Sequence, residues 1–206
     1  PSLTKCDTAG RWYEEEYIRS TIPFAHRSAD SNTLLKAFYE EAMPCLKILM
    51  SFQSPEVKDL RVYLKDLIGI PEVRRLSTVE LSGSEFEKIK CFLDYMVGRL
   101  REEGNVLIYL VFTHGDFCPA NMLSTKRGIK FIDWESAKVR SALFDWYSYF
   151  FYRIVSSNHS VDKVVSEINE GLPYSISGLM ITMPAIAQSL SHFEKVYRWM
   201  YYVEEV

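Results

Sequence analysis

The fold is decided by His114-Gly115-Asp116-Phe117-Cys118-Pro119-Ala120-Asn121, followed by Ile132-Asp133-Trp134-Glu135. An apolar, β-rich run over 106–112 precedes the first segment and predicts a buried strand. Two short runs over 121–124 and 129–132 flank a Gly-containing turn, which predicts a tight hairpin. We therefore expect Asp116 in a loop after a buried strand, and Asp133 at the end of the hairpin's second strand.

These segments place an acid, an amide and a second acid in the order that magnesium-dependent phosphoryl transfer needs. Asp116 and Asn121 have the spacing of a kinase catalytic loop, and Asp133 follows twelve residues after Asn121. We expect Asp116 to orient an acceptor hydroxyl and receive its proton. Asn121 and Asp133 would offer oxygen ligands to Mg²⁺, because the hairpin turns the chain so that both face one site. The competing interpretation is that all three are ordinary turn residues at strand ends.

Length and composition set broad bounds. The 206 residues suffice for one substantial core or two small domains, and the net charge of -3 gives no electrostatic reason to expect nucleic acid. No apolar run reaches the length of a membrane span and no signal peptide is visible, so we expect a cytoplasmic protein without a membrane span. The four cysteines are widely spaced and include no C-x-x-C pair, so we expect them to be reduced thiols in a cytoplasmic protein. The chain begins with Pro1 instead of Met, which suggests a trimmed or partial protein.

Before the predicted strand over 106–112, most apolar residues recur at helical spacing. It predicts a helix over 34–42, which Pro44 should kink or end. Ser54-Pro55-Glu56 has the pattern of a cap, a first-turn proline and a first-turn acid, so a second helix should begin there. That helix would carry an apolar stripe over 57–68 and end at Gly69.

The clearest helix spans 84–103, just before the strand, and everything from Ser141 onward has a helical pattern. Breaks are expected at 171–173, which contains Gly and Pro, and at Pro184. Aromatic residues over 146–152 lie on both faces of their helix, which favours core packing over a ligand cage. The whole pattern predicts a mostly helical α+β fold with one short hairpin.

The motif formed by His114-Gly-Asp-x-x-x-x-Asn121 and Ile132-Asp133-Trp134-Glu135 resembles the aminoglycoside phosphotransferase and choline kinase family. This family shares the protein-kinase-like fold, and the order of helix, strand, loop and hairpin is similar to its larger, C-terminal lobe. Gly115 stands where protein kinases carry Arg, as is common in the family. The resemblance implies a kinase acting on small molecules, with Mg²⁺ and with ATP as phosphoryl donor.

The resemblance also assigns two supporting residues. Asp145, at the start of a helix after the metal motif, would brace the catalytic loop by accepting hydrogen bonds from its backbone. The alternative is a first-turn acid favoured by the helix dipole. His114 would be a structural residue of the loop and not a general base, because Asp116 fills that role in the family.

Residues 10–18 resemble the hinge strand of the family, whose backbone pairs with adenine, and the nearest candidates are Glu16, Tyr17 and Ile18. The alternative is a solvated acidic segment. No Gly-rich loop or strand lysine of the smaller lobe is found, so the N-terminal lobe is expected to be largely absent. Residues 1–20 would then hold the hinge and a remnant of the nucleotide lobe. Residues 21–206 would form the helical, acceptor-binding lobe, which alone should bind ATP poorly and be incomplete for activity.

The first functional hypothesis is therefore a small-molecule kinase with an aminoglycoside, choline, ethanolamine or sugar-like acceptor. The second is a non-catalytic binding or scaffold protein of kinase-like fold, and intact Asp116, Asn121 and Asp133 argue against it. A protein kinase is the third, and the Gly at position 115 counts against it. Lys138 and Arg140 could meet an anionic acceptor or be solvated. The acceptor, the choice of ATP or GTP, and the oligomeric state stay open.

Overall fold

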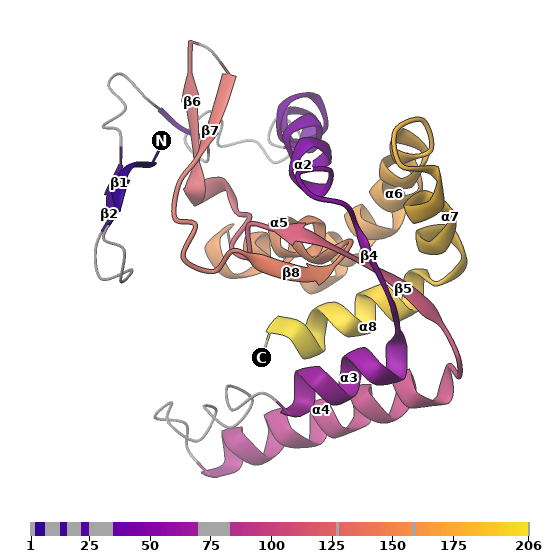
Figure 1. Ribbon diagram of the computed structural model, residues 1–206. Coiled ribbons are helices and arrows are strands. Elements are labelled where there is room, and N and C mark those ends of the chain that lie inside the picture. The colour runs from indigo at the N-terminus through magenta and orange to yellow at the C-terminus, as the bar shows by residue number, and fades with distance from the viewer. Residues whose placement is uncertain are drawn as a thin grey trace.

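The computed structural model describes residues 3–6, 13–15, 22–24, 35–69, 83–126, 128–157 and 160–205. Figure 1 shows most helices gathered around a short three-stranded sheet, with a hairpin projecting on one side. The fold is mostly helical with small antiparallel sheets, which confirms the α+β class expected from the sequence. No helix among the described residues is long and apolar enough to cross a membrane.

The central sheet has the order β4-β5-β8 and is antiparallel throughout. β5 (Leu107–Thr113) is the predicted buried strand and lies in the middle, between β4 (Glu56–Asp59) and β8 (Lys138–Ser141). Pairing of Thr113 with Lys138 places the end of β5 beside the start of β8. The sheet therefore holds the loop that follows Thr113 against the segment that follows the hairpin.

The predicted hairpin consists of β6 (Met122–Thr125) and β7 (Gly128–Phe131), and a short strand β3 (Ile22–Pro23) pairs with β6. Gly128 has a φ of 104°, a left-handed conformation that favours glycine in this turn. Two further strands, β1 (Leu3–Cys6) and β2 (Tyr13–Glu15), form a separate antiparallel pair. β2 lies within the expected hinge 10–18, whereas Glu16, Tyr17 and Ile18 lie outside the described residues.

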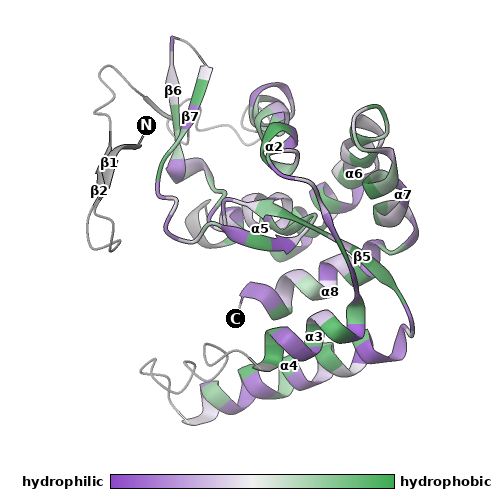
Figure 2. Cartoon of the chain, viewed as in Figure 1, coloured by the Kyte–Doolittle hydropathy of each residue, from purple (hydrophilic) through white to green (hydrophobic). Residues whose placement is uncertain are grey.

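Helices supply most of the core. They are α2 (Met43–Met50), α3 (Leu60–Gly69), α4 (Gly83–Glu102), α5 (Phe144–Ser157), α6 (Val161–Leu179), α7 (Pro184–His192) and α8 (Glu194–Glu205). Figure 2 shows that α4 alternates hydrophilic and hydrophobic residues along its length, as expected of a helix with one face on the protein. The helix predicted over 84–103 is α4, and its stripe packs against α3 and α8.

The aromatic residues of α5 form core contacts, as their distribution indicated. Trp146 and Phe150 are fully buried, with ring centroids 4.3 Å apart, and Tyr149 lies 4.2 Å from Phe38. The indole N–H of Trp146 donates to Ser175 Oγ on α6 at 2.9 Å, so its one polar atom is satisfied. These side chains pack α5 between α6 and the turn that precedes α2.

The prediction of a helix beginning at Ser54 was wrong. Residues 56–59 form β4, because their backbone pairs with β5, and this distant pairing overrides the local cap-like pattern. The helix α3 begins after Asp59 instead, whose Oδ1 accepts the backbone N–H groups of Arg61 and Val62 at 2.9 and 3.2 Å. The sequence also missed β8, which lies between Asp133 and the region expected to be helical.

At two positions where the sequence predicted a helix break, the structure shows that the helix continues. The chain continues past Pro44, which lies in the first turn of α2, and the preceding turn Phe38–Ala42 is a π-helix. The wider turn accommodates the proline ring and its missing N–H. Helix α6 runs unbroken through 171–173, where a Cβ on Gly171 would overlap the Tyr39 hydroxyl, so this glycine serves close packing. A break does occur before Pro184, which begins α7.

Candidate active site

The segment 114–121 leaves the end of β5 and closes with a single 3₁₀ turn, η4 (Pro119–Asn121). The side-chain amide of Asn121 donates from Nδ2 to Asp116 Oδ2 at 2.7 Å and to the Asp116 carbonyl at 3.1 Å. Asp116 is exposed and Asn121 is half-buried. The loop thus holds one carboxylate oxygen of Asp116 in place while the side chain faces solvent.

Asp133 lies beside this pair. The backbone N–H of Ile132 donates to the Asn121 carbonyl at 3.0 Å, so the residue after the hairpin's second strand is brought to the end of the loop. Asp133 has a φ of 63°, and aspartate is one of the few non-glycine residues that tolerate this left-handed conformation. Backbone strain of this kind is concentrated at functional sites, because only a well-braced structure maintains it.

Asn121 and Asp133 offer one neutral and one charged oxygen donor, and their oxygen chemistry suits Mg²⁺. No group of three or more His, Cys, Asp or Glu that could hold a metal exists among the described residues. Such a pair fits Mg²⁺ only with water or phosphate oxygens as further ligands, which is how this ion is commonly held beside nucleotides. The donor set therefore fits a magnesium–nucleotide complex better than a permanent metal site.

His114 is fully buried under the loop. Its Nδ1 accepts the backbone N–H of Asp116 at 3.4 Å, and its Nε2 contacts the Ile132 carbonyl at 2.9 Å. These partners require the neutral ring with the proton on Nε2, and burial lowers the pKa of His114 in agreement. The imidazole therefore connects the loop to the end of the hairpin through these two contacts.

Asp145, in the first turn of α5, lies behind the loop. Its carboxylate accepts the backbone N–H of His114 at 2.7 Å and that of Gly115 at 2.9 Å. The side chain is buried, and this burial raises the pKa of Asp145 to about 6, against the effect of the two N–H groups and of Arg140. The first turn of α5 thereby fixes the backbone on which Asp116 stands.

Gly115 is required by its surroundings. Its φ is 87°, and a Cβ at this position would overlap the Ser136 carbonyl and lie 2.7 Å from Nη1 of Arg140. No side chain fits between the loop and the segment that follows Asp133. The glycine in place of the protein-kinase arginine is therefore explained by packing in this chain.

Arg140 is a residue of the site whose position the sequence did not reveal. It is only 6% exposed, so the expected solvated or acceptor-facing arginine is absent. Its Nη1 donates to Thr113 Oγ1 and to the Ser136 carbonyl, both at 2.9 Å, while its guanidinium lies 4.3 Å from the Phe144 ring centroid. Arg140 thus links the end of β5 to the segment that follows Asp133, whereas Lys138 is exposed.

A buried carboxylate compensates this arginine. Glu204, on α8, accepts hydrogen bonds from the Tyr63 hydroxyl at 2.6 Å, the Ser141 backbone N–H at 2.8 Å and the Ser141 hydroxyl at 2.5 Å. Burial raises the pKa of Glu204, and the nearby Arg140 opposes this shift. The loop, the sheet, α3 and α8 are therefore connected through one charged cluster.

The fold and this loop define a protein of the protein-kinase-like class. A family model described as the phosphotransferase enzyme family (APH) matches residues 20–162, more than half of the chain, and the chain belongs to this family. This confirms the resemblance to the aminoglycoside phosphotransferase and choline kinase group. No curated protein matches the chain.

Two solved structures share the fold. Choline kinase LicA from Streptococcus pneumoniae has a TM-score of 0.55 and 15% identity, covering 99% of this chain and 66% of that one. LicA in complex with AMP has a TM-score of 0.50 and 13% identity, covering 98% of this chain and 72% of that one. At such low identity the likeness shows the fold alone, and the chain spans just under two thirds of the first structure's length.

Proposed function

We propose that the chain carries the metal- and acceptor-binding lobe of a kinase that moves the γ-phosphoryl group of ATP to a small-molecule hydroxyl. The observation that supports this most directly is the Asn121 amide bonded to Asp116 Oδ2, with Asp133 held beside it through the Ile132–Asn121 backbone bond. Ordinary turn residues would not need this pairing. The family match supports phosphotransferase chemistry in general.

Each residue then has a definite role. Asp116 keeps Oδ1 for the acceptor hydroxyl, because Oδ2 is engaged by Asn121. It receives the hydroxyl proton as the hydroxyl oxygen bonds to the γ-phosphorus, and the bond from that phosphorus to ADP breaks, so that ADP leaves. Asn121 and Asp133 would hold magnesium through their side-chain oxygens, and the ion would supply positive charge that compensates the phosphates. His114 and Asp145 keep the loop backbone in place without contacting the reactants.

The proposal extends to the ligands. The nucleotide would be bound partly by a hinge at 10–18, through Glu16, Tyr17 and Ile18, with 1–20 and 21–206 as the two parts of the chain. Amino alcohols such as choline or ethanolamine are proposed as acceptors, along with aminoglycosides and sugars, since a fold relative is a choline kinase. The AMP in a structure of that relative supports the proposal of a nucleotide as the other ligand. We also propose that the protein acts in the cytoplasm, which the free thiols of Cys45, Cys91 and Cys118 support.

The test is a phosphorylation screen with the full natural protein that contains these residues. ADP release from MgATP is measured with amino alcohols, sugars and aminoglycosides, and ³¹P NMR identifies the product. Asp116→Asn should lower kcat by roughly a hundredfold or more, because it removes the proton acceptor. Asp94→Asn is the matched control, since Asp94 is an exposed carboxylate on α4 away from the loop.

Near-normal turnover by Asp116→Asn would refute its assignment as the base. Absence of phosphoryl transfer to every acceptor class, with MgATP bound, would favour the non-catalytic scaffold instead.

A further inference from the structure

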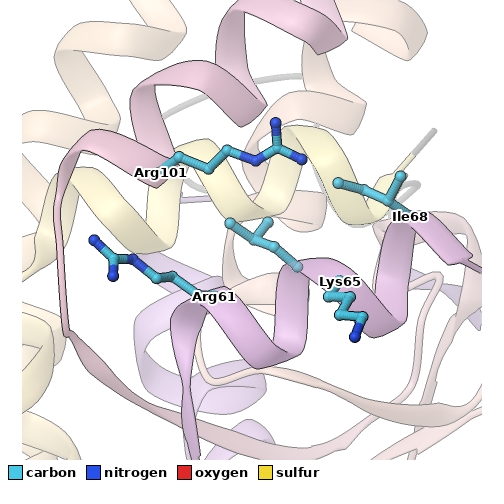
Figure 3. A pocket seen from close by; sticks show the side chains of 5 residues that line it. Arg61, Lys65, Ile68 and Arg101 are labelled. Atoms are coloured by element: carbon cyan, nitrogen blue, oxygen red, sulfur yellow. The ribbon is translucent and has the colours of Figure 1, made fainter.

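A second feature lies on α3 and α4, away from the catalytic loop and the hairpin (Figure 1). It is a pocket of about 680 Å³. Among the described residues, its lining consists of Arg61, Leu64, Lys65, Ile68 and Arg101. Figure 3 shows Arg101 reaching over the hollow from the end of α4, with Arg61, Lys65 and Ile68 on α3. None of these residues belongs to the proposed active site.

Three of the five lining side chains are cationic. Within the part of the chain that the structure describes, no acidic side chain forms an ion pair with Arg61, Lys65 or Arg101. This concentration of unpaired positive charge stands out in a chain whose net charge is -3. Unpaired cations around a hollow attract anions, because the low-dielectric wall focuses their field.

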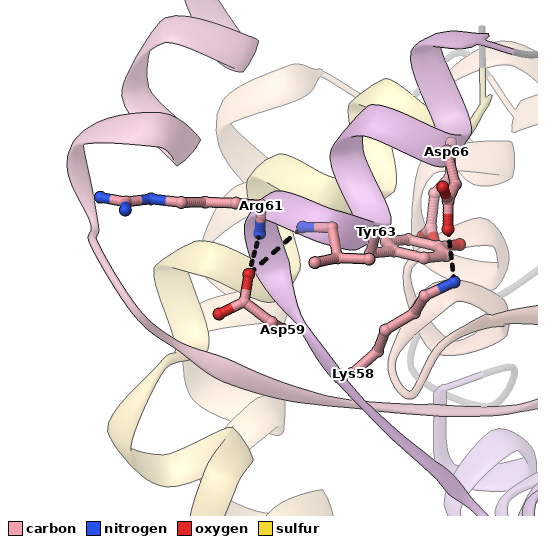
Figure 4. A network of polar contacts seen from close by, with 7 residues as sticks. Lys58, Asp59, Arg61, Tyr63 and Asp66 are labelled. Atoms are coloured by element: carbon pink, nitrogen blue, oxygen red, sulfur yellow. Dashed lines mark hydrogen bonds and ion pairs between the residues drawn. The ribbon is translucent and has the colours of Figure 1, made fainter.

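Neighbouring charges are engaged elsewhere. Lys58 pairs with Asp66 at 2.6 Å, and Asp59 accepts the first N–H groups of α3, as Figure 4 shows. On α4, Arg99 pairs with Glu102 at 2.7 Å. Asp59, Asp66 and Glu102, three carboxylates close in sequence to the pocket's cations, thus have other partners among the described residues.

The pocket also has an apolar part. Leu64 is 2% exposed, whereas Ile68 keeps 38% of its surface exposed, and both line the pocket. An occupant that only carried charge would leave this aliphatic surface in contact with water. The lining therefore matches an anion with an attached organic group.

We infer that this pocket binds a small phosphate monoester. Its volume falls within the range of small-molecule sites, about 300–1,000 Å³. A phosphate monoester carries a charge near -2 at neutral pH, so it compensates the three cations better than a single carboxylate. Two guanidinium groups supply the forked donors that match phosphate oxygens, and Leu64 and Ile68 would contact the organic substituent. This inference does not depend on the proposed kinase activity.

The direct test is isothermal titration calorimetry of the 206-residue chain with hexyl phosphate, which combines a phosphate monoester and an alkyl group. We expect saturable binding to one site. Arg61→Gln/Lys65→Gln should weaken it roughly tenfold or more, because two charge-assisted contacts are lost. Lys88→Gln/Lys90→Gln removes the same charge from exposed positions of α4 outside the pocket and should change the affinity less than about twofold.

Arg101→Gln serves as a second pocket variant on the other helix, and circular dichroism melting checks that all variants are folded. Hexanol should not bind measurably, since it lacks the phosphate. Failure of hexyl phosphate to saturate the wild-type chain would overturn the inference. Equal weakening by the pocket and control variants would do the same, because it would reduce the effect to net charge.

The phosphate could belong to a free metabolite or to a lipid headgroup. Sedimentation with phosphatidylcholine vesicles that contain phosphatidic acid separates these sources. Vesicle binding that Arg61→Gln/Lys65→Gln abolishes would assign the pocket to a lipid headgroup. Binding of hexyl phosphate without vesicle binding would assign it to a soluble phosphate ester.

Discussion

The carboxylate of Asp145 accepts the backbone N–H of His114 at 2.7 Å, joining the first turn of α5 to the end of β5 across thirty-one residues of chain. The second oxygen accepts the N–H of Gly115, so both oxygens are used. Since burial raises the pKa of Asp145 to about 6, the group is mainly ionised at neutral pH and becomes protonated on mild acidification. The contact that braces the loop over 114–121 therefore contains a titratable group.

Asp145→Asn should destabilise the fold at pH 7 by about 1–3 kcal/mol, because an amide nitrogen cannot accept the second backbone N–H. The difference should depend on pH. The native state binds the Asp145 proton more tightly than the unfolded chain, whose Asp has the ordinary pKa of 3.8, so ionisation between these values disfavours the native state. The stability advantage of the wild type over the variant should thus shrink by roughly 2 kcal/mol from pH 4 to pH 7.

Urea unfolding at several pH values measures this advantage. Asp162→Asn, at an exposed position in the first turn of α6, is the matched control and should show a small, nearly pH-independent effect. A wild-type advantage that grew with rising pH would contradict the raised pKa of Asp145.

Gly115→Ala should cost about 3 kcal/mol or more of stability. It adds a side chain at a φ of 87° and forces its Cβ into the Ser136 carbonyl. Gly104→Ala is the matched control, because Gly104 has a φ of 80° but open space around its Cβ, and should cost only about 1 kcal/mol. Urea unfolding compares the two, and equal costs would mean that the loop moves freely away from Ser136.

The parts of the fold predictable from the sequence were those specified by short-range patterns. The strand before His114, the hairpin over 122–131 and helix α4 follow from periodicity and turn residues within their own segments. The spacing of Asp116, Asn121 and Asp133 is likewise local, so these residues could be proposed together and are found at adjoining positions.

What the sequence could not show depends on distant partners. Residues 56–59 become a strand only because β5 is available to pair with them. Arginine is usually found on the protein surface. Arg140 is nevertheless buried, and its guanidinium donates hydrogen bonds to Thr113 and Ser136. No periodicity marks a charged residue as buried when its compensating carboxylate, Glu204, lies more than sixty residues away.

Cysteine labelling should report on the rigidity of the loop over 114–121. Cys118 is buried two residues after Asp116, and burial raises its pKa to about 11, so the reactive thiolate is scarce at neutral pH. Cys91 is exposed on α4. Iodoacetamide at pH 7.5 with peptide mapping should label Cys118 at least roughly a hundredfold more slowly than Cys91.

Urea should remove this difference by unfolding the chain, and Cys91→Ser provides the control for peptide assignment. Comparable labelling rates in the folded protein would show that the loop opens readily.

The last prediction concerns the charged cluster behind the loop. Arg140→Met removes the cation whose charge acts most strongly on buried Glu204, and it also leaves Thr113 and the Ser136 carbonyl without their donor. An unpaired buried carboxylate is costly, so this variant should lose about 3–5 kcal/mol of stability. Lys138→Met, at an exposed position on the same strand, should change stability by less than about 0.5 kcal/mol.

Because the cost of Arg140→Met arises largely from the stranded charge, neutralising Glu204 should relieve it. Glu204→Gln retains an oxygen that can accept from Tyr63 or Ser141, so Arg140→Met/Glu204→Gln should be more stable than the sum of the two single changes predicts, by roughly 1 kcal/mol or more. Urea unfolding of all four proteins completes the double-mutant cycle. Strict additivity would show that Arg140 stabilises the loop through its hydrogen bonds alone, and that Glu204 is sustained by Tyr63 and Ser141 without the arginine.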